Sequence, residues 1–290
     1  MIVSLIITLR ETLEMALIIG IIFRYLRKSN QLEYKKYVYW GIIAGLIMSI
    51  SGALLINNLS ILFEGRTEQI FEGVIMLLGA FFLTTMILWM LNQKNIAEEL
   101  EEKLQKQTNK THKFGVFSVV FVSILREGIE TVLFLGAARF SEESNSLLGA
   151  IIGIIAALIL GIIIYQGTSK INLKLFFKFT SYFLIIIAAG LLAHGIHEFQ
   201  EAGIIPIVIE HIYDINFILD ENRTFGSFLK GLFGYNGNPS LIETIAYVVY
   251  MIVIFNIWRY LNMQKIQKIK LQNSKSQQID PHLTSEEISS

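Results

Sequence analysis

The 290-residue chain has no cysteine, only 3 prolines and few charged residues. Without cysteine it can form no disulfide framework, thiolate metal site or cysteine nucleophile, so oxygen or imidazole must hold any bound metal. Charged residues make up 17% of the chain, compared with about 25% in soluble domains. Lys and Arg together number 24, as do Asp and Glu, which excludes a globally basic nucleic-acid-binding protein.

Long apolar runs dominate the sequence instead. A helix that crosses a bilayer needs about 20 mostly apolar residues, and seven runs are long enough: about 2–24, 38–59, 69–91, 114–138, 147–165, 179–199 and 241–261. The first run has no basic n-region and no small-residue cleavage site, so we expect it to be retained rather than cleaved as a signal peptide. We predict an all-α polytopic membrane protein with seven transmembrane helices.

The remaining segments are polar or mixed. We predict one membrane domain over residues 1–261, followed by a polar cytoplasmic tail over 262–290 that is disordered. The polar segment 92–113 predicts a short solvated helix. Apolar patches in the outer loop, residues 200–240, predict interfacial helices.

Lysine and arginine are distributed unevenly between the loops. If the N-terminus lies outside, the inner loops and tail hold 18 of these cations, and the outer loops hold only 4: Arg66, Arg139, Arg223 and Lys230. Cytoplasmic loops of membrane proteins carry an excess of Lys and Arg. The distribution therefore predicts an N-out, C-in orientation.

The two remaining arginines lie inside apolar runs, and each begins an R-E-x-x-E pattern. The pattern occurs at Arg10, Glu11 and Glu14 in the first run and at Arg126, Glu127 and Glu130 in the fourth. Three charged residues near the centre of a span cost very roughly 8–10 kcal/mol on an insertion scale. We therefore expect both motifs to face the bundle interior, where their charges can be paired or solvated.

The spacing within each motif suits a cation site. Glutamates three residues apart share a helix face, and an arginine can reach the glutamate four residues later. One arginine cannot neutralise two carboxylates, so each motif keeps about one negative charge when all groups are ionised. Two such helices facing each other would form a four-carboxylate cage suited to a di- or trivalent cation. The alternative is that these charges form buried salt bridges that fix helix register.

The duplicated motif also indicates an internal repeat. The two arginines are 116 residues apart, and the second motif-bearing span comes three spans after the first, which places those spans in opposite directions. Transporters are commonly built from inverted repeats. We predict two inverted three-helix repeats, about 1–91 and 114–199, with a seventh helix at 241–261. Ridges of small residues in the second and fifth spans would allow close helix packing.

Further acids and imidazoles lie near the predicted outer face, at the start of the third span and the end of the sixth. A cluster of this kind could concentrate cations above the motifs, although plain charges at span ends remain the alternative. The predicted outer vestibule consists of Glu68, Glu72, His197 and Glu198.

These residues resemble the iron permease family, the oxidase-dependent iron transporters of fungi and bacteria. That family carries R-E-G-L-E-type motifs in its first and fourth transmembrane helices, and here the motifs read R-E-T-L-E and R-E-G-I-E. The similarity extends to EGVIMLLGA, HGIHEFQEAG and GLFGYNGNPSLIET, so it covers most of residues 1–260. One departure is Thr12, where the family usually has glycine.

The resemblance implies a high-affinity iron permease of the cell membrane, with iron as the transported substrate and no bound organic cofactor. It also implies an extracytoplasmic oxidase, peroxidase or iron-binding lipoprotein as partner, and no nucleic acid. The valence of the iron stays open, as does transport of another divalent metal such as lead or manganese. The composition favours a bacterial member. The implied site has Glu11, Glu14, Glu127 and Glu130 as iron ligands, with Arg10 and Arg126 completing the motifs.

Two other classes of protein remain as alternatives: a membrane-embedded metal enzyme, such as a di-metal oxidase or a protease, and a metal sensor. Bundle di-iron enzymes use Glu-x-x-His pairs, which the spans lack. Zinc proteases use H-E-x-x-H or H-x-x-E-H, which the segment His194–Glu198 does not match. The tail contains no recognisable output domain for a sensor. We therefore expect a transporter and no enzymatic activity.

Overall fold

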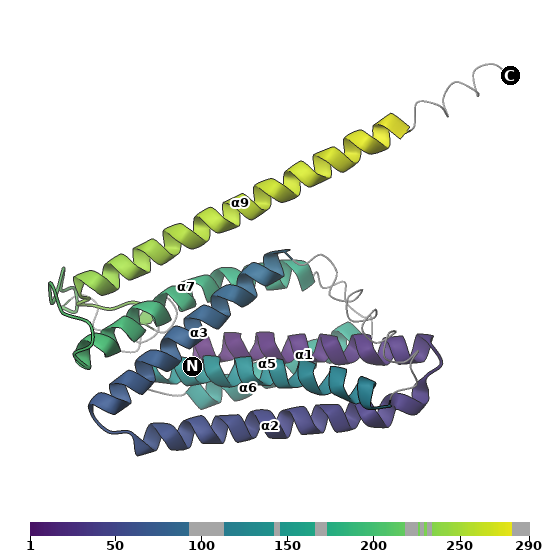
Figure 1. Ribbon diagram of the computed structural model, residues 1–290, viewed down its shortest axis with the longest axis horizontal. Coiled ribbons are helices and arrows are strands. Elements are labelled where there is room, and N and C mark those ends of the chain that lie inside the picture. Colours follow the sequence, from purple (N-terminus) through teal and green to yellow (C-terminus); the bar gives the residue numbers. More distant parts are fainter. Residues whose placement is uncertain are drawn as a thin grey trace.

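The computed structural model describes residues 1–92, 113–141, 146–165, 173–217, 226, 229–230 and 234–279, and its long elements are all α-helices (Figure 1). No strand occurs within these ranges. The prediction of an all-α protein is therefore confirmed for this part of the chain. The elements are α1 (Ile2–Lys28), η1 (Leu32–Tyr34), α2 (Lys35–Leu62), α3 (Arg66–Asn92), α5 (Lys113–Ser141), α6 (Ser146–Tyr165), α7 (Leu173–Glu201) and α9 (Leu241–Ile279).

Most of these helices have the length and composition of membrane spans. Helices α1 and α5 contain 27 and 29 residues, so both exceed the roughly 30 Å of a hydrocarbon core, but each carries one charged motif near its middle. The described residues contain five helical segments that are both long and apolar enough to cross a membrane: Leu32–Leu62, Arg66–Trp89, Ser146–Ile163, Leu175–Glu201 and Leu241–Leu261. The structure therefore supports a helical membrane protein.

The first helices of the chain pack mainly on helices far away in sequence. Helix α1 lies along α6, α2 lies along α5, and α3 lies along α7, while α9 packs mainly on α7. Glycines permit the closest of these contacts. A Cβ on Gly41 would lie 2.9 Å from Val120 Cβ, and a Cβ on Gly45 would lie 2.9 Å from Ile124 Cγ2. At Gly153 of α6, a Cβ would collide with α1 in the same way.

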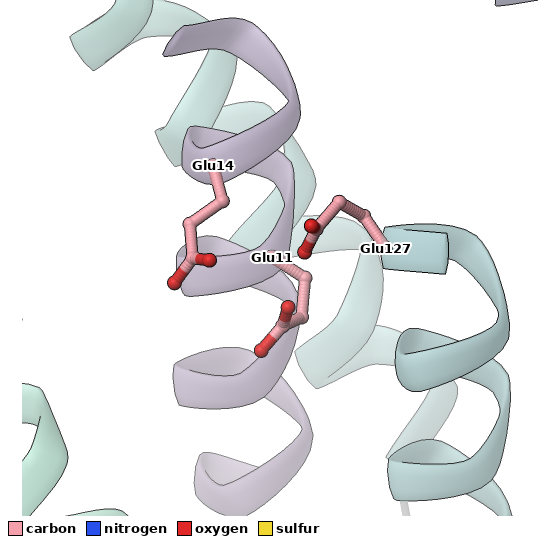
Figure 2. Close-up of side chains that lie close together, drawn as sticks. All are labelled: Glu11, Glu14 and Glu127. Atoms are coloured by element: carbon pink, nitrogen blue, oxygen red, sulfur yellow. The ribbon is translucent and has the colours of Figure 1, made fainter. Parts of the chain in front are cut away.

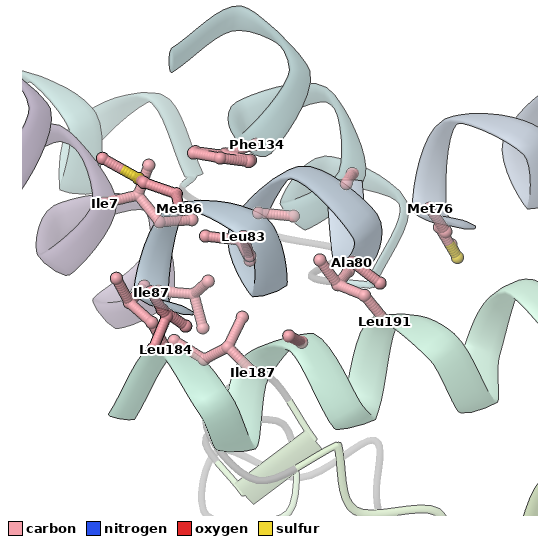
Figure 3. Close-up of a cluster of buried hydrophobic side chains, with 14 of the residues drawn as sticks. Ile7, Met76, Ala80, Leu83, Met86, Ile87, Phe134, Leu184, Ile187 and Leu191 are labelled. Carbon is pink, nitrogen blue, oxygen red and sulfur yellow. The ribbon is translucent and has the colours of Figure 1, made fainter. Parts of the chain in front are cut away.

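Two separate apolar clusters stabilise the bundle. The first joins α1, α3, α5 and α7 through fully buried side chains such as Ile7, Leu83 and Phe134 (Figure 3). The second joins the C-terminal half of α1 to η1, α2 and the N-terminal half of α5, and it includes Ile22 and Ile124. Along both α1 and α5, the charged motif lies in sequence between residues of the two clusters.

Two segments outside the motif helices are described only in part, the C-terminal tail and the outer loop. The backbone stays helical through Ile279, well beyond residue 262, where a disordered tail was expected (Figure 1). Residues 202–217 of the outer loop form turns, bends and irregular chain, whereas residues 226, 229 and 230 of the same loop are helical. Most of the predicted solvated helix, residues 93–112, and the end of the tail, 280–290, lie outside the described residues.

The close contact between α2 and α5 predicts that a larger side chain at Gly45 will lower the stability of the fold. Gly45→Val should destabilise the folded protein by about 1–3 kcal/mol, because overpacking at a tight contact carries such a cost. The expected result is a lower Tm for thermal unfolding in detergent, followed by tryptophan fluorescence.

Gly52→Val is the matched control, because a Cβ on Gly52 of the same helix meets nothing within 4 Å. An equal fall in Tm for both variants would contradict the close packing of α2 on α5.

Candidate metal centre

The motif helices α1 and α5 pack against each other and bring carboxylates from both motifs together. One ligand oxygen from each of Glu11, Glu14 and Glu127 lies within 4.8 Å of the other two. Figure 2 shows Glu11 and Glu14 on α1, with the side chain of Glu127 reaching from α5 toward α1. Across the described ranges, this is the one group of three or more acidic or imidazole side chains that converges so closely.

The spacing of this group suits a small cation. Glu11 and Glu14 share a face of α1 because they are three residues apart, and Glu127 approaches that face from the neighbouring helix. A cation that binds carboxylate oxygens at about 2.0–2.2 Å, as zinc does, holds its ligand oxygens about 3–4 Å apart. Small side-chain rotations would therefore bring all three carboxylates into contact with one ion.

Arg10 bridges the two glutamates of the first motif. Its side chain is 0% exposed, its Nη1 donates a hydrogen bond to Glu11 Oε1 at 3.0 Å, and its Nη2 lies 2.9 Å from Glu14 Oε1. The predicted contact between Arg10 and the glutamate four residues later is confirmed. These two ion pairs offset part of the large cost of burying a guanidinium group.

The second motif is arranged differently. Arg126 Nε donates a hydrogen bond to Glu130 Oε1 at 2.8 Å, and the Arg126 side chain is 47% exposed. Glu130 is not a member of the convergent group. Glu127 is buried and has no ion pair within the described residues. The structure thus brings together three of the four predicted carboxylate ligands and holds the fourth on Arg126.

Four buried carboxylate oxygens accept no hydrogen bond in the described part of the chain: Glu11 Oε2, Glu14 Oε1, Glu127 Oε2 and Glu130 Oε2. Of these, Glu14 Oε1 lies in an ion pair with Arg10. Buried acceptors without a partner are costly. Salt bridges that only fix helix register would account for the contacts of Arg10 and Arg126, but they leave Glu127 without a partner. A bound cation would satisfy these oxygens and offset the two formal negative charges left by four carboxylates and two guanidinium groups.

Apolar side chains flank this charged region along both helices. Ile7 of α1 and Phe134 of α5 belong to the first apolar cluster, and Ile22 and Ile124 belong to the second. The charges therefore interact in surroundings of low dielectric constant, where their attraction for a cation is much stronger than in water.

The predicted outer-vestibule residues lie on two helices that pack closely. Helices α3 and α7 approach each other at Gly73 and Gly195, and Gln69 donates a hydrogen bond to Glu201 at 3.0 Å. Among the described residues, no three acidic or imidazole groups meet here as tightly as the motif carboxylates do. The α3 members of the predicted vestibule are Glu68 and Glu72, and the α7 members are His197 and Glu198.

Sequence reasoning missed one acid in this outer region, Glu243. Its Oε1 lies 3.0 Å from His197 Nδ1, and its Oε2 accepts a hydrogen bond from Asn236 at 2.9 Å. Ser240 and Glu243 also exchange backbone-to-side-chain hydrogen bonds, which form a capping box at the start of α9. The S-x-x-E spacing was the available signal. Glu243 thus starts the helix and orients His197.

Known proteins are similar to this chain over most of its length. The model of the iron permease FTR1 family matches residues 1–264. Proteins named ferrous iron permease EfeU from Escherichia coli O157:H7 and Yersinia pestis are each 33% identical over 257 residues, which cover 87% of this chain. The match spans 93% and 91% of those two proteins, respectively. No solved structure matches the chain.

The different surroundings of Glu127 and Glu130 predict unequal effects on metal binding. Removal of a residue that only hydrogen-bonds to a metal ligand commonly weakens metal binding about 10–100-fold. Glu127→Gln removes a carboxylate that would bind the ion directly, so it should weaken Fe(II) binding by at least about tenfold. Glu130→Gln should weaken it less, because Arg126 already holds Glu130. Equilibrium titration of the purified protein in detergent measures both affinities, and equal losses would contradict this distinction.

Proposed function

The chain belongs to the iron permease FTR1 family, and from this premise we propose that it moves ferrous iron into the cytoplasm through its paired intramembrane motifs. Its family and its long apolar helices make it a multi-pass membrane protein. The names of its relatives favour Fe(II) as the transported ion. The convergence of Glu11, Glu14 and Glu127 between α1 and α5 is the observation that carries the proposal.

In this proposal the carboxylates replace the hydration shell of the entering ion. Glu11, Glu14 and Glu127 form the part of the site that is assembled before iron arrives. Glu130 becomes the fourth ligand when its carboxylate turns from Arg126 toward the ion. Carboxylate oxygens are hard ligands that suit iron, and the two formal negative charges of the six motif residues match the charge of Fe(II).

The proposed architecture has seven spans in an N-out, C-in orientation, with two inverted three-helix repeats, α1–α3 and α5–α7, followed by α9. Helices α1 and α5 complete the span count because their motif charges face each other within the bundle. The helix pairing supports the repeat: the first helix of each half packs on the second helix of the other, and the two third helices pack together. The sequence supports the orientation through its excess of inner Lys and Arg.

Capture and release take place on opposite sides of the motifs in this proposal. The outer-vestibule acids attract the ion, and movement of one repeat against the other exposes the motif carboxylates first to the outside and then to the cytoplasm. The supporting features are the position of the vestibule on α3 and α7 and the apolar clusters on both sides of the motifs. An extracytoplasmic oxidase, peroxidase or iron-binding lipoprotein would deliver the ion.

Uptake of radioactive iron into proteoliposomes tests the proposal. Glu11→Gln and Glu127→Gln should each abolish uptake, because each variant removes a negative charge and an oxygen ligand while keeping the size of the side chain. Both variants should insert and unfold like the unaltered protein, as checked by their yield and Tm in detergent. Normal uptake by both variants would overturn the carboxylate-site model.

The choice of ion is tested in the same vesicles by supplying Fe(II), Fe(III), Mn(II) and Zn(II) separately, each with and without a pH gradient. Accumulation should be fastest with Fe(II). Binding without accumulation of any of the four ions would instead indicate a sensor, and faster accumulation of another ion would overturn the assignment to ferrous iron.

A further inference from the structure

Both motif arginines are contacted by the same third helix, α3, which carries neither motif. Met86 Sδ accepts a hydrogen bond from Arg10 Nη1 at 2.8 Å, and the indole ring of Trp89 lies 5.1 Å from Arg126 Cζ. Residues three apart lie on one face of a helix. One face of α3 therefore contacts the guanidinium groups of both repeats.

These two contacts have an unusual chemical character for a charged site. A thioether sulfur is a weak, uncharged acceptor, and an indole ring attracts a cation through its electron-rich face. Neither group carries a formal charge. They can hold the arginines without reducing the two formal negative charges that the six motif residues present to a cation, whereas a further carboxylate at either position would change that balance.

The position of Arg126 makes the contact with Trp89 important. Arg126 is half-exposed in the middle of α5, a position where an uncompensated charge is expensive in a membrane. Its guanidinium contacts Trp89 and Glu130 at the same time. The adjacent glutamate, Glu127, lacks an ion pair in the described part of the chain. If the guanidinium left Trp89, it could move to Glu127 and compete there with the metal.

Met86 has the corresponding role at the buried arginine. Nη1 of Arg10 contacts both Met86 Sδ and Glu11 Oε1, while Nη2 contacts Glu14. Met86 is buried in the first apolar cluster, so its side chain has little freedom to move. The sulfur thereby fixes the orientation of the guanidinium, and Glu11 Oε2 accepts no hydrogen bond from any residue that the structure describes.

We propose that Met86 and Trp89 are positioning residues for iron binding: they hold Arg10 and Arg126 on their present partners and so keep Glu11 and Glu127 available to the ion. This inference rests on the proposed function. Its consequence is that α3 sets the affinity of the site although it supplies no ligand.

The test is the initial rate of Fe(II) uptake into proteoliposomes, measured as KM and as Vmax per protein molecule. Met86→Leu and Trp89→Leu should each raise KM about three- to tenfold, the range expected for loss of a modest cation–π or sulfur contact, with Vmax within about twofold. Trp89→Phe keeps a smaller aromatic face and should lie between Trp89→Leu and the unaltered protein. A merely structural role would lower Vmax and leave KM unchanged.

Two variants on the same helix are matched controls. Met76→Leu alters another fully buried methionine, and Phe81→Leu alters an exposed aromatic residue; no described contact joins either residue to the motif arginines. Both controls should keep the KM of the unaltered protein. An unchanged KM in Met86→Leu and Trp89→Leu, or the same change in the controls, would overturn the inference.

A second measurement separates positioning from general damage. In Arg126→Gln protein, the addition of Trp89→Leu should cause no further loss of Fe(II) affinity in detergent, because Trp89 acts through Arg126. Additive losses would overturn the role of Trp89. Glu11→Gln and Glu127→Gln in the same series test the proposed function separately. Normal uptake by both variants would contradict the function, whereas loss of their uptake beside an unchanged KM in the α3 variants would contradict only this inference.

Discussion

The structure depends on one electrostatic constraint: each of the two long, largely apolar helices α1 and α5 carries three charged residues near its middle. Neither helix can expose these charges to lipid at an acceptable cost. The helices α1 and α5 meet this constraint by packing their motifs against each other, so that Arg10 and Arg126 lie among four carboxylates. The same arrangement leaves an excess of negative charge in an apolar surrounding, which is the condition for attracting a cation.

The two motifs respond to this constraint differently despite their similar sequences. In the first, Arg10 is fully buried and pairs with both glutamates, whereas in the second, Arg126 is half-exposed and pairs with Glu130 alone. Because of this difference, Glu127 is the one motif carboxylate that has no ion pair among the described residues. The Glu127 carboxylate converges with the two glutamates of the first motif. The duplicated motif has therefore produced two unequal environments, one in which the arginine pairs with both glutamates and one in which it pairs with a single glutamate.

Helix packing outside the motifs allows the charged side chains of the two motifs to approach each other. Small residues allow α2 to approach α5 and α6 to approach α1, which places both motif helices within the bundle. Gly128, inside the second motif, packs against Ser49 of α2, where a Cβ would collide. At the corresponding position of the first motif, Thr12 is accommodated as a half-buried side chain. The departure from glycine at Thr12 therefore does not prevent the carboxylates of Glu11, Glu14 and Glu127 from converging.

The sequence by itself determined the helical class, the approximate positions of the helices, the two charged motifs and the family, because apolar length, charge spacing and motif identity are local properties of the chain. Contact between Arg10 and Glu14 followed from helix geometry for the same reason. Only the tertiary structure decided that Glu127 and not Glu130 joins Glu11 and Glu14, and that Met86 and Trp89 touch the arginines. These contacts depend on how each packed helix is rotated about its axis and shifted along it. A run of apolar residues contains no sequence pattern that predicts either quantity.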